Sequence, residues 1–97
     1  MDRSEILNRL RQRRREIEER FPVERLGLFG SAARDELRDD SDIDVLVAFH
    51  GKATLDGYFG LKSYLEQLLV RKVDLVTENA LKPRARSYVE RDLIRVP

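Results

Sequence analysis

Residues 42–48, with the sequence DIDVLVA, constrain the fold most strongly, because two acidic residues begin an otherwise apolar run. Aspartate is depleted from β-strands, yet the apolar residues that follow are typical of a buried strand. Side chains at positions i and i+2 of a strand point to the same face, so Asp42 and Asp44 are expected side by side. Two such carboxylates repel each other unless a cation lies between them, and hard oxygen ligands suit Mg²⁺ or Mn²⁺. The run therefore predicts a strand that begins with a metal site.

A second strand-like run, residues 72–77, carries one further carboxylate, Asp74. If this strand pairs beside the first, the carboxylates of Asp42, Asp44 and Asp74 converge. We interpret all three as catalytic metal ligands. A site of one or two metal ions would bind phosphates, activate the attacking group and neutralise charge on a leaving pyrophosphate.

A candidate phosphate site precedes these carboxylates, where Gly30 and Ser31 follow the short apolar run 26–29. Glycine permits the close approach of a phosphate, and successive backbone N–H groups at the start of a helix favour anions. The Ser31 hydroxyl can add a hydrogen bond, and Arg34, one turn later, can reach a phosphate. We therefore expect Gly30 and Ser31 to bind phosphate, and Arg34 to contact a phosphate or the metal-bound acceptor.

Each of these features also has an ordinary structural explanation. A Gly-Ser pair after a strand is usually only a turn. A pair of aspartates at the start of a strand more often forms a solvated edge or a cap. Two competing motifs are excluded. The spacing of residues 40–44 resembles the start of an EF-hand loop, but Val45 and Gly51 stand where the glycine and the bidentate glutamate are required. The Walker A pattern is absent. The combination of three features favours the metal-dependent site.

The remaining pattern predicts alternating helices and strands in one α/β or α+β domain over residues 1–97, with a small mixed sheet flanked by helices. Apolar residues at helical spacing predict helices over 4–20, with Ser4 as N-cap, and over 55–70. The expected elements are helices 4–20, 31–37, 55–70 and 83–92, and strands 26–29, 42–48, 72–77 and 93–96.

Composition limits the classes of function. The chain has no cysteine, which excludes disulfides and thiolate metal sites. It has no apolar run of about 20 residues and no apolar signal segment at its start, so we expect a soluble, cytoplasmic protein without membrane contact. Its net charge is only +1, so direct nucleic-acid binding is not expected.

The run GSAAR at residues 30–34, followed by SDIDVLV at 41–47, resembles the signature of the nucleotidyltransferase superfamily, which has the DNA polymerase β-like fold. The short chain and the late VDLV at 73–76 resemble the minimal nucleotidyltransferase (MNT) family, over nearly the whole length. The resemblance implies Gly30 and Ser31 at the triphosphate, the strand carboxylates as metal ligands, and Asp74 as activator of the acceptor hydroxyl. Many members have glycine after the arginine, where this chain has Asp35. A carboxylate there would either weaken nucleotide binding or point to solvent.

MNT proteins similar to this one commonly act as antitoxins that transfer AMP from ATP to a tyrosine of an all-helical HEPN ribonuclease. The resemblance therefore implies a Mg²⁺-dependent protein adenylyltransferase that forms a hetero-oligomer with a HEPN toxin. The chain shows no separate acceptor-binding domain, which favours a macromolecular acceptor. Two alternatives stay open: a non-catalytic antitoxin that masks its partner by binding, and a small-molecule nucleotidyltransferase subunit whose acceptor pocket comes from another chain.

Three aromatic residues at helical spacing, Tyr58, Phe59 and Tyr64, are interpreted as core or interface residues, with stacking on a nucleobase as the alternative. His50, just after the second strand, is interpreted as a solvated loop residue.

Overall fold

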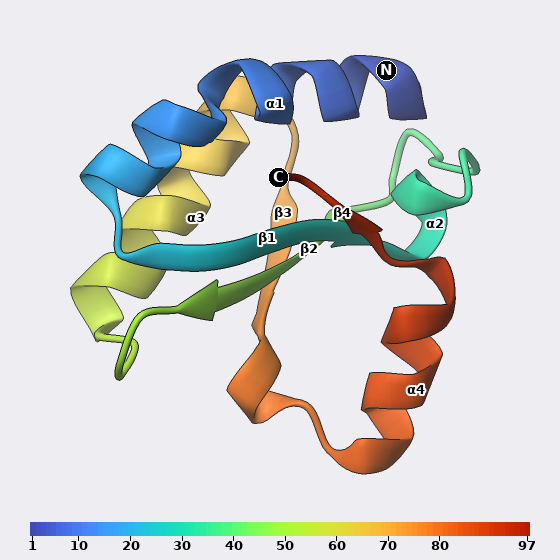
Figure 1. Cartoon of the computed structure of the whole chain (residues 1–97). Helices are drawn as coiled ribbons and strands as arrows, with labels where there is room; N and C mark the ends of the chain where they lie inside the picture. The colour runs from blue at the N-terminus through green and yellow to red at the C-terminus, as the bar shows by residue number, and fades with distance from the viewer.

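Four strands form one mixed sheet in the order β3-β2-β1-β4 in the computed structural model, which describes all 97 residues (Figure 1). β1 and β2 are antiparallel, β2 and β3 are parallel, and β4 pairs antiparallel with β1. β3 and β4 are therefore the two edge strands. The elements in chain order are α1 (Arg3–Arg20), β1 (Val23–Phe29), α2 (Gly30–Ala33), β2 (Ile43–Phe49), α3 (Leu55–Leu69), β3 (Val73–Thr77), the 3₁₀ turn η1 (Glu78–Ala80), α4 (Pro83–Asp92) and β4 (Ile94–Arg95).

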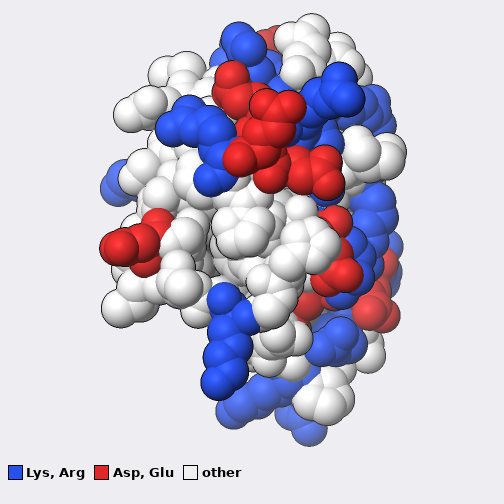
Figure 2. All heavy atoms as spheres, turned by 60° about the vertical axis from the view of Figure 1, so that its left-hand side comes forward, with Lys and Arg blue, Asp and Glu red and all other residues white.

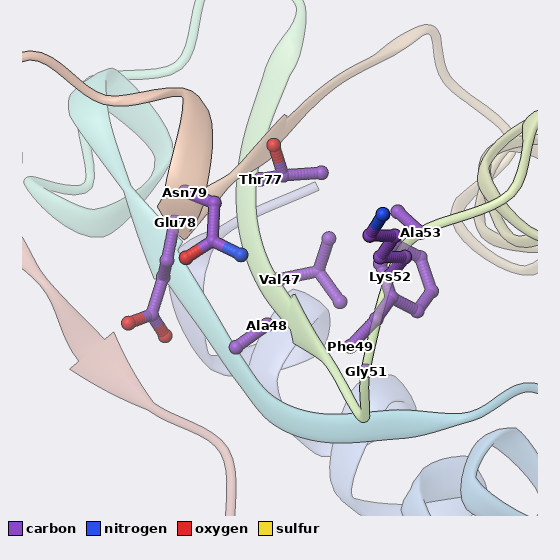
Figure 3. Close-up of a pocket in the computed structure, with 9 residues that line it drawn as sticks. All are labelled: Val47, Ala48, Phe49, Gly51, Lys52, Ala53, Thr77, Glu78 and Asn79. Atoms are coloured by element: carbon purple, nitrogen blue, oxygen red, sulfur yellow. The ribbon is translucent and has the colours of Figure 1, made fainter.

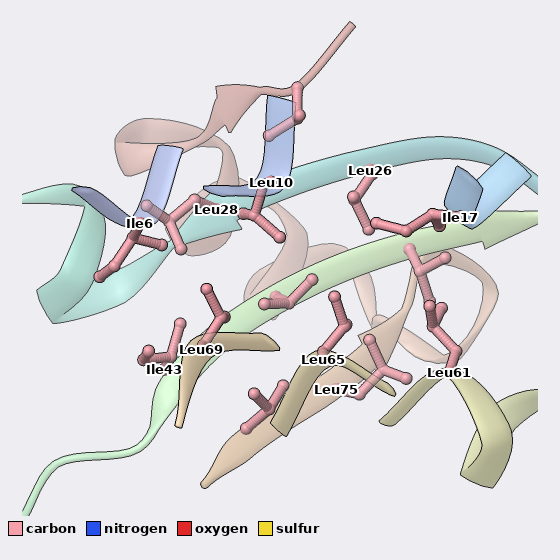
Figure 4. Close-up of a cluster of buried hydrophobic side chains, with 14 of the residues drawn as sticks. Ile6, Leu10, Ile17, Leu26, Leu28, Ile43, Leu61, Leu65, Leu69 and Leu75 are labelled. Atoms are coloured by element: carbon pink, nitrogen blue, oxygen red, sulfur yellow. The ribbon is translucent and has the colours of Figure 1, made fainter. Parts of the chain in front are cut away.

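Helices α1 and α3 cover one face of this sheet and enclose the core (Figure 4). Alternate residues of β2 point into it, so that Ile43, Val45 and Val47 are fully buried. Strand periodicity then directs Asp44 and Leu46 to the opposite face, where α4 lies (Figure 1). The sheet thus has a helix-covered apolar face and a second face that carries the acidic residues.

The mixed α/β architecture, the element order and the pairing of the third strand beside the second agree with the sequence prediction. The predicted cap of α1 is wrong. Asp2, rather than Ser4, is the N-cap, and its carboxylate accepts a hydrogen bond of 2.9 Å from the backbone N–H of Glu5. Aspartate and serine are both good caps, so local preference alone does not distinguish the two positions.

Some element boundaries also differ from the prediction, and two of the differences have a clear backbone cause. The helix expected over 31–37 ends at Ala33, and Asp35 has a φ of 61°, which a right-handed helix does not allow. Helix α3 ends at Leu69 because Val70 has a φ of 54°. β1 begins at Val23, three residues earlier than expected.

Charged side chains of both signs surround an uncharged central area on the face turned forward in Figure 2. Helix α3 lies on this side of the molecule (Figure 1), and it keeps two large apolar side chains, Leu55 and Phe59, in solvent. None of the helices is long and apolar enough to cross a membrane.

Candidate active site

Asp44 and Asp74 lie next to each other at the beginning of the parallel strands β2 and β3, where they are paired in the register of the sheet. Both belong to the sheet face opposite α1 and α3, because their neighbours Ile43, Val45 and Leu75 fill the core. Asp44 is half-buried, whereas Asp74 is exposed. The pair thus consists of one carboxylate held within the sheet and one that faces solvent at its edge.

This arrangement makes the ionised form of Asp44 unfavourable. Burial is the main cause, and the negative charge of Asp74 and a hydrogen bond from the protonated form of Asp44 to Asp74 add to it. The charge of Asp42 acts in the same direction, while Arg34 opposes it. Together they raise the pKa of Asp44 from 3.8 to about 6. Two carboxylates in this state are suited to share a cation.

Asp42 lies one residue before the strand that was predicted to begin with it. It is exposed and immediately precedes β2, whose first residue is Ile43. No group of three Asp, Glu or His side chains is arranged closely enough to hold a metal ion between them. The expected convergence of three carboxylates is therefore absent from this structure. Asp42 lies outside the strand pairing that places the other two side by side.

Gly30 directly follows β1 and lies against the side chain of Asp44. Its φ of 69° is in the left-handed region, which glycine adopts without strain. A Cβ atom added here would lie 2.2 Å from Oδ2 of Asp44, far inside van der Waals contact. The carboxylate thus packs directly against the turn, and only glycine leaves room for it. Sequence reasoning identified Gly30 for a different reason, the approach of a phosphate.

A shallow hollow of about 290 Å³ brings the predicted phosphate-binding residues Gly30, Ser31 and Arg34 together with Asp44, one of the predicted metal ligands. It also contains two side chains of α4 that sequence reasoning missed, Tyr88 and Asp92. Asp92 forms an ion pair with Arg34, with 2.7 Å between Oδ2 and the guanidinium nitrogen. Tyr88 and Asp92 are four residues apart on a helix and so share a face, but nothing in the sequence shows that this face meets the Gly30 turn. The lining residues are Phe29, Gly30, Ser31, Arg34, Asp44, Tyr88 and Asp92.

Asp35 turns away from this hollow and contacts the start of α1. Its carboxylate accepts a hydrogen bond of 2.9 Å from the backbone N–H of Arg3, in the first turn of the helix. The Arg3 side chain in turn donates to the carbonyl of Ala33 at 3.1 Å. Asp35 therefore neither faces the expected phosphate site nor points freely into solvent, because it satisfies one of the unpaired N–H groups of α1.

Two of the three aromatic residues of α3 pack against the core, as their spacing predicts. The Tyr58 hydroxyl donates to the carbonyl of Leu75 at 2.5 Å, and that of Tyr64 donates to Glu16. Phe59 is exposed, as is His50. None of these residues lines the hollow beside Asp44.

A second hollow, of about 300 Å³, lies at the far end of the same strands (Figure 3). It is formed by the last residues of β2, by the loop after it and by Thr77–Asn79. In the register of the sheet, Val47 and Thr77 are three residues beyond the carboxylate pair, a distance of about 10 Å along a strand. This hollow contains neither Asp44 nor Asp74 and is separate from the candidate active site.

Residues 10–96 match the family model of the nucleotidyltransferase domain. A protein adenylyltransferase, MntA, from Thermococcus cleftensis is 40% identical over 92 residues, which cover 95% of this chain and 93% of the relative. The solved structure of a candidate minimal nucleotidyltransferase has a TM-score of 0.76 and 44% identity, covering 97% of this chain and 95% of the other. A chain from the complex of a tri-AMPylated Shewanella oneidensis HEPN toxin with an MNT antitoxin shares the fold, with a TM-score of 0.70, 19% identity and coverage of 98% and 71%.

Proposed function

Because this chain belongs to the nucleotidyltransferase domain family, we propose that it transfers AMP from ATP to a protein partner and so acts as the antitoxin of a HEPN toxin. One observation carries the proposal: Asp44 and Asp74 stand side by side on parallel strands, directly beside the Gly30–Ser31 turn. Its relatives point to a protein as the acceptor of AMP. One is a protein adenylyltransferase, and a structural neighbour comes from a toxin–antitoxin complex whose toxin carries AMP.

The acidic pair fits a divalent cation, and we assign Asp44 and Asp74 as its ligands, with Asp42 as a third ligand from the adjoining loop. The fit rests on the donor set, which consists of two neighbouring carboxylates whose negative charges repel each other. Mg²⁺ is commonly held by one or two carboxylates together with substrate phosphates and water, so a preformed cluster of three carboxylates is not required. When bound, Mg²⁺ would supply charge neutralisation for the triphosphate and the leaving pyrophosphate.

The other residues of the hollow position the nucleotide. Gly30 leaves space for the phosphates beside Asp44, and the Ser31 backbone and hydroxyl donate hydrogen bonds to them. Arg34 supplies a positive charge from the adjacent turn. The acceptor hydroxyl attacks the α-phosphorus and forms a new O–P bond, while the bond to the bridging oxygen breaks and pyrophosphate leaves. Asp74, the more exposed carboxylate, takes the proton from the hydroxyl.

The test is the intact mass of a HEPN-domain partner, co-expressed with this chain, after incubation of the complex with ATP and Mg²⁺. We expect the wild type to add whole AMP units to the partner. Asp44→Asn should add none, whereas Asp39→Asn, the same change in an exposed loop carboxylate, should behave as wild type. A partner that stays inhibited without any gain in mass would reject catalysis and favour masking by binding.

A further inference from the structure

Tyr88 occupies a position in the candidate active site that no packing requirement explains. It lies on α4, and its side chain is 63% exposed although it is large and aromatic. The same side chain lines the hollow that contains Gly30, Ser31 and Asp44. The other strongly exposed aromatic residue, Phe59, lies on α3, which covers the opposite face of the sheet.

The ring of Tyr88 also borders a shallow apolar depression, lined by the side chains of Ala85 and Val89 and by the chains of Lys82 and Arg84. Tyr88 therefore separates a polar hollow with carboxylates from an apolar one with a basic rim. A nucleoside triphosphate has the same division, because its phosphates are charged and its base is a flat, largely apolar ring. The two hollows match the two ends of this ligand.

Arg91 restricts the orientation of the Tyr88 ring. The guanidinium carbon of Arg91 lies 4.9 Å from the ring centroid, within the range of a cation–π contact. An aromatic ring has two faces, so a cation on one face leaves the other available for stacking. This contact favours one orientation of the exposed ring before a ligand binds.

We propose that Tyr88 is the platform on which the base of the nucleoside triphosphate stacks, above the apolar depression of Ala85 and Val89. This inference rests on the proposed function and adds the subsite for the base. Recognition rests mainly on stacking, because Ala85 and Val89, which line the depression beside Tyr88, have no hydrogen-bonding groups in their side chains, and Lys82 and Arg84 lie only at its rim. Every base has a face for stacking, so the subsite distinguishes nucleotides from inorganic triphosphate more strongly than it distinguishes one base from another.

The experiment measures the affinity of the purified chain for ATP, GTP and inorganic triphosphate by calorimetry in Mg²⁺. We expect Tyr88→Ala to bind ATP at least about fivefold more weakly, the lower range for loss of a base–aromatic stack, with no change for inorganic triphosphate. Tyr88→Phe and Tyr88→Trp should retain the wild-type affinity for ATP. Phe59→Ala, which removes an aromatic side chain of similar exposure from the other face, is the matched control and should also bind as wild type.

Three results would overturn the platform while leaving the proposed function intact. They are unchanged ATP binding by Tyr88→Ala, an equal loss for ATP and inorganic triphosphate, and a preference of the wild type for ATP over GTP of more than about a hundredfold, which would require a hydrogen-bonding base site. Failure of the wild type to bind any of the three ligands would instead overturn the proposed function together with the platform.

Discussion

Replacing Asp44 by asparagine should stabilise the metal-free protein at pH 7.5, although the same change abolishes the proposed transfer. At this pH the carboxyl group is ionised in the folded state despite burial and despite the neighbouring charges of Asp74 and Asp42. Asparagine has nearly the same shape and no charge. The substitution therefore removes an unfavourable electrostatic interaction and leaves the packing against Gly30 in place.

The pKa of Asp44 sets the size of this effect. A rise from 3.8 to about 6 corresponds to at most about 3 kcal/mol, at about 1.36 kcal/mol per pKa unit. Asp44 is only half-buried, and screening by solvent reduces the figure to about 1–1.5 kcal/mol. The folded state binds the proton more tightly than the unfolded state, so the penalty is complete above pH 6. It diminishes as the pH falls from 6 to 3.8, and it is absent below 3.8.

Urea unfolding in the presence of a chelator, followed by circular dichroism at several pH values, measures this difference directly. The free energy of unfolding of Asp44→Asn should exceed that of the wild type by about 1–1.5 kcal/mol at pH 7.5, and the two should converge towards pH 4. Asp39→Asn, a change in an exposed loop residue, should not show the effect. A variant less stable than the wild type at pH 7.5, or a gain independent of pH, would refute the electrostatic reasoning.

Four substitutions at three other positions test the backbone conformation by the same unfolding assay. Gly30→Ala should lose roughly 1–3 kcal/mol, because its Cβ would meet Asp44 at 2.2 Å in a left-handed turn, and wild-type stability would contradict that contact. Asp35→Ala should be about 1 kcal/mol less stable than Asp35→Gly: both lose the hydrogen bond to Arg3, but only glycine accepts a φ of 61° freely. Equal stability of the pair would argue against the left-handed backbone. Val70→Gly should gain up to about 1 kcal/mol, since a β-branched residue that is 75% exposed occupies a φ of 54°. A loss of stability on this substitution would show that the contacts made by the Val70 side chain outweigh its backbone strain.

Local patterns predicted most of the fold and one half of the candidate site. Periodicity located the helices and strands, and the isolated aspartates at 44 and 74 marked the two strands that pair with these residues opposite each other. The reason is that strand alternation fixes the face of each side chain without knowledge of the rest of the fold. Once the two strands pair in this register, the two carboxylates lie side by side on the same face.

The contribution of α4 was not predictable in this way. Tyr88 and Asp92 reach the site only because β4 pairs with β1 and returns the helix to the Gly30 turn. That placement depends on long-range packing, which leaves no local signal. The role of Asp35 was missed for a related reason, since its hydrogen-bond partner Arg3 lies 32 residues away in the sequence.

The position of Asp74 on the outermost strand also bears on solubility. β3 has five residues and leaves one side of its backbone unpaired, which makes it a template for strands of other molecules. A charge within such a strand, here at its second residue, opposes pairing between copies of the chain. Replacing Asp74 by valine would turn the edge into the apolar run VVLV, of the kind that promotes aggregation. The carboxylate assigned to chemistry thus also opposes edge-to-edge pairing between molecules, and inactive variants made for structural work are better built with asparagine than with an apolar residue at this position.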